Sequence, residues 1–183
     1  IKEAETLGLS DKEARRTAEM MGFDTRYIVS DAATTSDLCY ESARNLLASM
    51  EIDVKTIDGL IFVSQTPDYQ TPATATLLQD RLDMRIDTMC FDINLGCSGF
   101  VYGLSVAYSL IEAGMRRFLL CVGDTASKIV DPTDKTVAPI MGDAGSCILV
   151  EADPSSSVFQ LYSDGSGKDA LIMKGSGARD AYS

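Results

Sequence analysis

Histidine and tryptophan are both absent from this sequence of 183 residues. Because histidine is a common metal ligand and general base, its absence argues against a zinc site built from cysteine and histidine. The five cysteines form no C-x-x-C pair, and their odd number does not suit a secreted disulfide framework. We therefore expect no metal and no bound cofactor, and a histidine that assists a cysteine would have to lie outside these residues.

Basic residues are scarce, with 16 lysines and arginines against 27 acidic residues and a net charge of −11. A surface that binds nucleic acid needs positive charge, so the composition argues against a nucleic-acid partner. No apolar run reaches the length of a membrane span, and the charged residues 1–16 lack the apolar core of a signal peptide. We expect a cytoplasmic protein that does not bind a membrane.

The composition, 45% hydrophobic and 23% charged, is that of a globular domain, and the length is sufficient for one hydrophobic core. Four short runs rich in apolar residues predict strands, and the segments between them favour helices. The predicted strands are residues 57–66, 88–94, 116–124 and 145–152. This alternation predicts an α/β fold with a mostly parallel sheet covered on both faces, and no internal domain boundary is visible.

Three helices are predicted around these strands. One covers residues 36–50, a second begins with Thr71 as N-cap and Pro72 at the first helical position, and a third covers residues 98–113 and stops at Gly114. The third is apolar on nearly every face, as expected of a helix inside a large protein. One covering layer from this chain could not bury it, so we expect a second half of the molecule or a partner subunit to pack there.

Cys97 stands between a predicted strand and the apolar helix, in the stretch "NLGCSGF". The free N–H groups and the dipole of a helix N-terminus stabilise an anion such as a thiolate. The same N–H groups can hold the oxyanion formed when a thiolate attacks a thioester. This position favours Cys97 as a nucleophile whose own N–H is one oxyanion donor, with Gly96 and Ser98 supporting the turn. The alternative is a small core residue, which we expect of the other four cysteines.

Several segments, in this order and spacing, resemble one enzyme family. They are "DINLGCSGFVYGLSVAYSLIEAG" (92–114), "FLLCVGDTASKIVDPTDKT" (118–136), "MGDAGSCILVE" (141–151) and "YSDGSGKDALIM" (162–173). Together they resemble the β-ketoacyl-acyl-carrier-protein synthase III family of the thiolase fold. The resemblance is close over residues 57–173 and loose before them. The chain looks like the N-terminal half of such an enzyme.

The resemblance implies a layered α/β/α thiolase-like fold, of which residues 1–183 would form one half, and it implies a homodimer. In the implied reaction, Cys97 takes an acyl group from a coenzyme A or acyl-carrier-protein thioester. The acyl-enzyme then condenses with malonyl-acyl-carrier protein and carbon dioxide is lost. The family's histidine and asparagine belong to the C-terminal half, which fits the lack of histidine here. Acyl-coenzyme A and acyl carrier protein would be substrates and partners, not resident cofactors.

Three further positions carry over as substrate-binding residues. Lys135 replaces the arginine that contacts the adenine of coenzyme A in the family; lysine keeps the charge but lacks the planar surface, and the alternative is a solvated loop charge. Thr71 aligns with a residue that crosses the dimer interface and lines the partner's acyl pocket, where a small side chain would widen the pocket; the alternative is a simple helix cap. Asp143 could orient a neighbour, although we favour a structural role.

Two other functions remain open from the sequence. A relative with the same acyl-cysteine step could use another acceptor, as hydroxymethylglutaryl-coenzyme A synthase and ester-forming or amide-forming acyltransferases do. A non-catalytic ketosynthase partner, or an inactive fragment, is the second alternative. Such partners usually lack the cysteine, and Cys97 between Gly96 and Ser98 argues against this reading.

Overall fold

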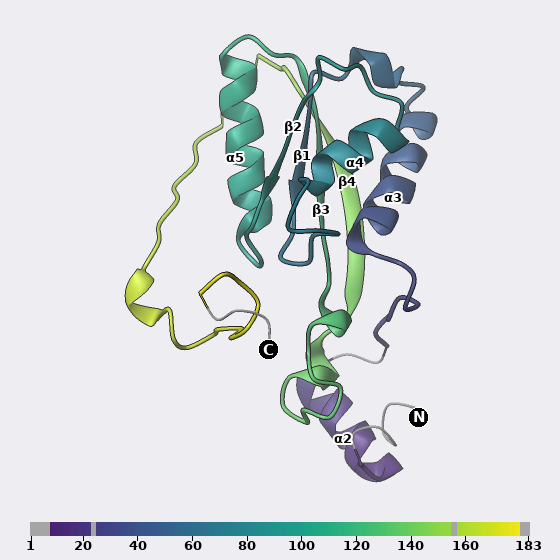
Figure 1. The fold of residues 1–183 in the computed structure, drawn as a ribbon, viewed down its shortest axis with the longest axis vertical. Coiled ribbons are helices and arrows are strands. Elements are labelled where there is room, and N and C mark those ends of the chain that lie inside the picture. Colours follow the sequence, from purple (N-terminus) through teal and green to yellow (C-terminus); the bar gives the residue numbers. More distant parts are fainter. Residues whose placement is uncertain (1–7, 23–24, 155–156, 180–183) are drawn as a thin grey trace.

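A four-stranded sheet with helices on both faces forms the body of the protein (Figure 1). The structure is a computed structural model that describes residues 8–22, 25–154 and 157–179. The strands are β1 (Gly59–Val63), β2 (Met89–Ile93), β3 (Arg117–Thr125) and β4 (Asp143–Glu151), in the order β2-β1-β3-β4. The prediction of an α/β fold is confirmed, and each predicted strand lies within three residues of an observed one at both ends.

The sheet is mostly parallel, as predicted, and β4 is the antiparallel strand. β1 runs parallel to β2 and to β3, whereas β4 is antiparallel to β3. The chain between β3 and β4 contains only two short 3-10 turns, η2 (Ala126–Lys128) and η3 (Ala138–Ile140). A parallel connection needs a crossover, usually a helix, so this link returns the chain antiparallel. The carboxyl ends of β1, β2 and β3 and the amino end of β4 therefore share one edge, here called the carboxyl edge.

The principal helices are α2 (Asp11–Met21), α3 (Thr35–Ser49), α4 (Thr74–Arg81) and α5 (Gly99–Glu112), with short 3-10 turns at η1 (Val54–Thr56) and η4 (Gly165–Gly167). The predictions of α3 and α5 are confirmed to within one residue at each end. The predicted start of α4 is wrong. Its N-cap is Ala73, and Thr71 and Pro72 precede the helix.

The cap of α4 comes from the sheet and not from the adjoining sequence. The carboxylate of Asp92 on β2 accepts hydrogen bonds from the N–H groups of Thr74 (2.7 Å) and Ala75 (2.8 Å). These are free donors at a helix N-terminus, and a negative charge there is favourable. Because the cap is distant in sequence, a local cap at Thr71 was the wrong prediction.

The two faces of the sheet are covered unequally (Figure 1). Helices α3 and α4 pack on one face around Leu60, Phe62 and Leu119, whereas α5 is the one helix of the described residues that packs on the other. On the α5 side, Phe100 and Val101 remain 42% and 44% exposed, and apolar residues of β3 and β4 are only partly buried. The expectation that this chain cannot bury the apolar helix fully is confirmed for the described structure.

Helix α5 approaches the sheet closely because its inner face lacks side chains at two positions. A Cβ atom on Gly99 would lie 2.6 Å from Cγ1 of Val63. A Cβ atom on Gly103 would lie 2.8 Å from Cδ1 of Leu120 and 2.9 Å from Cγ2 of Val63. Contacts below 3.0 Å force a shift, so these glycines fix the distance between α5 and strands β1 and β3.

A small lobe lies beyond the carboxyl edge, where α2 adjoins the link between β3 and β4 (Figure 1). Residues 157–164 run beside α5 without forming a helix or strand, and η4 and a series of turns and bends follow to residue 179 (Figure 1). This segment contacts α5 through the Tyr102 hydroxyl, which donates to the carbonyl of Tyr162 (3.1 Å), and through the rings of Tyr108 and Phe159. No helix within the described ranges combines the length and the apolar character needed to cross a membrane.

The close approach of α5 gives a stability prediction. Replacing Gly103→Val should lower the free energy of unfolding by about 2 kcal/mol, because the added atoms overpack against Val63 and Leu120. Ser109→Val is the matched control: it places the same side chain on an exposed position of the same helix and should change stability by less than about 0.5 kcal/mol. Urea denaturation of the variants measures both values. Equal values for both variants would mean that the helix tolerates the added volume.

Candidate active site

Cys97 lies in the five-residue connection between β2 and α5, whose last four residues, 95–98, are here called the Cys97 turn. The Leu95 N–H donates to the carbonyl of Ile93 (3.1 Å), and the Gly99 N–H donates to the carbonyl of Gly96 (2.7 Å). Ser98 is the N-cap of α5, but its side chain makes no capping hydrogen bond. The Cys97 side chain is exposed, so this cysteine is not a core residue of the described structure.

Backbone donors are available at this turn. Within the part of the chain that the structure describes, the N–H groups of Cys97 and Ser98 have no hydrogen-bond acceptor. They lie at the amino end of α5, where free N–H groups and the helix dipole favour negative charge. These two features favour negative charge at this turn, whether on a thiolate or on an oxygen beside it.

The other four cysteines have different surroundings. Cys39 of α3, Cys121 of β3 and Cys147 of β4 are buried in one core cluster, and the sulfur atoms of Cys121 and Cys147 are 3.4 Å apart. Hydrogen bonding to Cys147 and Cys39, together with burial, raises the pKa of Cys121 well above its ordinary value. Cys90 on β2 is half-buried, and burial raises its pKa to about 11. Cys97 is thus the one exposed cysteine of the chain.

Gln65 and Asp124 are next to the Cys97 turn at the carboxyl edge, and our sequence predictions missed both. The Asp124 carboxylate at the end of β3 accepts the Gln65 N–H (2.7 Å) and the Ser64 hydroxyl (3.0 Å). The carboxamide of Gln65 in turn lies against Gly96, where a Cβ atom would be 2.3 Å from Oε1. Polar residues that follow parallel strands are the sequence signal that could have identified them.

The predicted substrate-binding residues lie apart from this turn. Thr71 is exposed in the loop before α4. Lys135 is exposed in the link between β3 and β4 and is close to the start of α2, since a Cβ atom on Gly8 would be 3.9 Å from its Nζ. The structure therefore brings Cys97, Gly96 and Ser98 together in one turn and places Thr71 and Lys135 in two other loops.

Asp143 has structural contacts. Its carboxylate accepts hydrogen bonds from the Val29 N–H (2.9 Å), the Ser127 N–H (2.9 Å) and the Ser127 hydroxyl (2.5 Å). The side chain is buried, and both of its oxygens are engaged by protein donors. Asp143 thus ties the segment before α3 to the start of the β3–β4 link.

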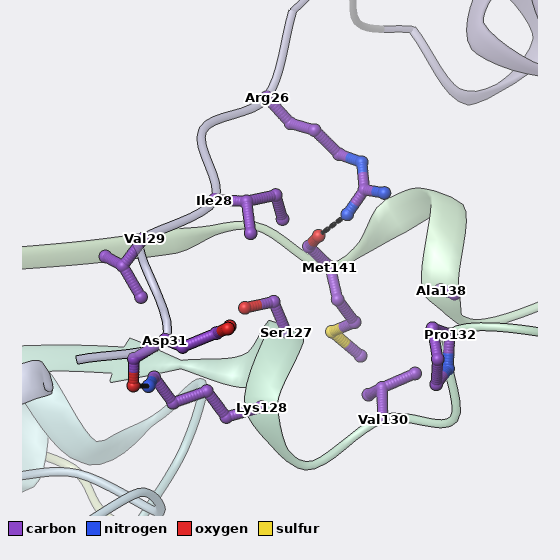
Figure 2. A pocket seen from close by; sticks show the side chains of 10 residues that line it. All are labelled: Arg26, Ile28, Val29, Asp31, Ser127, Lys128, Val130, Pro132, Ala138 and Met141. Atoms are coloured by element: carbon purple, nitrogen blue, oxygen red, sulfur yellow. Dashed lines mark hydrogen bonds between the residues drawn. The ribbon is translucent and has the colours of Figure 1, made fainter. Parts of the chain in front are cut away.

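A cavity of about 250 Å³ lies in the small lobe, between residues 26–31 and the β3–β4 link (Figure 2). The guanidinium of Arg26 donates to the carbonyl of Met141, and Nζ of Lys128 donates to the carbonyl of Asp31 (2.6 Å). Both side chains therefore connect the two segments that line the cavity. None of the lining residues belongs to the Cys97 turn. Among the described residues, no three metal-ligating side chains gather in one place.

Comparison with known proteins gives consistent matches. Residues 91–166 match the family described as 3-oxoacyl-[acyl-carrier-protein (ACP)] synthase III. The β-ketoacyl-[acyl-carrier-protein] synthase III 2 of Halalkalibacterium halodurans is 38% identical over 158 residues, which are 84% of this chain and 47% of that protein.

Solved structures agree in both sequence and fold. A 3-oxoacyl-(acyl-carrier protein) synthase from Burkholderia xenovorans LB400 is 39% identical with a TM-score of 0.79, over 84% of this chain and 44% of that one. A 3-oxoacyl-(acyl carrier protein) synthase III from Pseudomonas aeruginosa PAO1 is 31% identical with a TM-score of 0.84, over 97% and 55%. The chain spans about half the length of the relatives it matches.

The surroundings of the cysteines predict selective alkylation. Iodoacetamide at pH 8 should modify Cys97 first in the native protein, because Cys97 is exposed and only thiolates react. With its pKa near 11, about one Cys90 thiol in a thousand is ionised at that pH. Peptide mapping after a short reaction should therefore find the label on Cys97, and Cys97→Ser should remove it. Label on Cys90 or Cys121 at a similar rate would contradict this prediction.

Proposed function

Since this chain belongs to the 3-oxoacyl-[acyl-carrier-protein] synthase III family, we propose that it supplies the acyl-accepting cysteine of an acyltransferase of that type. One observation carries the proposal: the exposed Cys97 lies at the amino end of α5 beside backbone N–H groups that have no acceptor in the described structure. An enzyme that forms a thioester on cysteine needs both features.

In the first step, the Cys97 thiolate attacks the carbonyl carbon of an acyl thioester of coenzyme A or of acyl carrier protein. The carbonyl oxygen becomes negative and is held by the N–H of Cys97, at the amino end of α5. When the tetrahedral intermediate collapses, the bond to the donor sulfur breaks and the donor leaves as a thiolate, which takes a proton from water. The acyl group remains on Cys97 as a thioester.

In the second step, malonyl-acyl-carrier protein loses carbon dioxide, and the carbanion so formed attacks the acyl carbon on Cys97. The new carbon–carbon bond gives a 3-oxoacyl product, and the Cys97 thiolate is released. The groups that promote decarboxylation would come from residues outside this sequence, which contains no histidine. A condensation of this kind places the protein in fatty-acid biosynthesis.

The unequal cover of the sheet supports an assembly larger than the chain. Residues 1–183 would form the N-terminal half of a thiolase-like enzyme, and the second half would cover α5 and the partly buried apolar residues of β3 and β4. Burial of such a surface is the main favourable free energy for packing two halves. We further propose a cytoplasmic homodimer in which Thr71 reaches the partner's acyl pocket and Lys135 supplies a positive charge at the adenine end of coenzyme A.

Loading of Cys97 by an acyl donor tests the function directly. The full-length protein should gain the mass of one acyl group per chain on incubation with a suitable acyl-coenzyme A from a panel of chain lengths. Peptide mapping should place the group on Cys97, and Cys97→Ser should abolish the gain. Cys90→Ser is the matched control and should load like the natural protein, because Cys90 is half-buried on β2.

An acyl group that persists in Cys97→Ser, or that maps to another residue, would contradict the proposed role of Cys97. If neither acyl-coenzyme A nor an acyl-carrier-protein thioester loads the full-length protein, the acyl-enzyme proposal fails and the non-catalytic alternative takes its place.

A further inference from the structure

The carboxamide of Gln65 occupies the space that a side chain at position 96 would need. A Cβ atom built on Gly96 would be 2.3 Å from Oε1 of Gln65 and 2.9 Å from its Cδ. Gly96 directly precedes Cys97, so the end of the Gln65 side chain lies against the backbone that carries the thiol. This contact joins the end of β1 to the connection between β2 and α5.

The backbone of Gln65 is itself fixed by the neighbouring strand. The Asp124 carboxylate accepts the Gln65 N–H at 2.7 Å, and a hydrogen bond to a charged acceptor is stronger than a neutral one. The same oxygen accepts the Ser64 hydroxyl at 3.0 Å, and the Ser64 N–H donates to the carbonyl of Ile93 at the end of β2 (3.2 Å). The ends of β1, β2 and β3 are thereby tied together on either side of Gln65.

A buried cluster of hydroxyl groups supports the next residue. The Thr66 hydroxyl lies 2.7 Å from that of Thr35 and accepts the Thr125 N–H at 2.9 Å. All three threonines are buried. Because these hydrogen bonds are shielded from water, the backbone on the carboxyl side of Gln65 has little freedom to move.

From these contacts we infer that Gln65, held by Asp124, is a positioning residue for the Cys97 turn. Its carboxamide supports Gly96 from the side of β1 and so sets where the Cys97 thiol and N–H point at the start of α5. The role in acyl transfer rests on the proposed function, whereas the contact with the turn does not. Gly96 lacks a side chain, and the carboxamide of Gln65 fills the space that this side chain would need.

A double-mutant cycle on the full-length protein tests the contact through the rate at which iodoacetamide alkylates Cys97. Gly96→Ala should lower that rate at least about tenfold, because its Cβ atom meets the carboxamide that Gln65 holds in place and so pushes the Cys97 turn aside. Gln65→Ala removes the obstructing atoms, so the variant with both substitutions should recover to within about threefold of Gln65→Ala alone. Circular dichroism establishes that each variant is folded.

A charge placed at position 65 gives a second and independent readout. Gln65→Glu keeps the shape of the side chain and adds a carboxylate beside the turn, which disfavours a nearby thiolate. The pH profile of Cys97 alkylation should therefore move to higher pH, with a rate at neutral pH about three to ten times lower. Gln79→Glu is the matched control: Gln79 contacts the carbonyl of Arg85 before β2, at the opposite edge, and the profile should not move. Asp92 and Asp124, the acidic groups at the ends of β2 and β3, are unchanged in every variant.

The inference is overturned if Gly96→Ala leaves the alkylation rate unchanged, or if adding Gln65→Ala brings no recovery. It is equally overturned if Gln65→Glu and Gln79→Glu give the same pH profile. Alkylation needs no acyl donor, so these rates decide the role of Gln65 even if no thioester loads Cys97. If an acyl donor loads Cys97 but Gln65→Ala does not restore the alkylation rate of Gly96→Ala, the proposed function stands and only the positioning role of Gln65 is rejected.

Discussion

Helix α5 packs closely on strands β1 and β3, and this packing fixes the position of the Cys97 turn that precedes the helix. Gly99 and Gly103 bring the helix axis against Val63 and Leu120, and larger residues at these positions would push it away. Since α5 begins directly after the Cys97 turn, its distance from the sheet also sets where that turn lies. The exposed thiol, the free N–H groups and the contact with Gln65 all follow from this position of the helix.

The carboxyl edge shows how a parallel arrangement gathers polar groups without any motif in the sequence. Gln65 follows β1, Cys97 follows β2 and Asp124 ends β3, and the three segments are far apart along the chain. Parallel strands bring these ends to the same edge, which is where sites form in α/β sheets. The edge is tied together by the Asp124 carboxylate and by buried threonine hydroxyls, so the turn rests on a rigid support.

Local patterns in the sequence predicted the parts of the fold that depend on local physics. The strands, α3, α5 and the place of Cys97 at a strand-to-helix turn follow from apolar spacing and from Gly96, Ser98 and Gly114. Predictions failed where a distant residue decides the outcome. Asp92 on β2 caps α4 and moves its start past Thr71. The contact of Gln65 with Gly96 depends on the packed sheet, and no spacing in the sequence encodes it.

In the proposed reaction, Cys97 accepts an acyl group while its own N–H holds the carbonyl oxygen. The most direct measurement is a crystal structure of the full-length protein after reaction with an acyl-coenzyme A that loads it. We expect a thioester on Sγ of Cys97, with the carbonyl oxygen about 3 Å from the Cys97 N. An acyl group on any other residue would contradict the proposed role of the Cys97 thiol. A carbonyl oxygen turned away from that N–H toward solvent would contradict the proposed role of the Cys97 N–H.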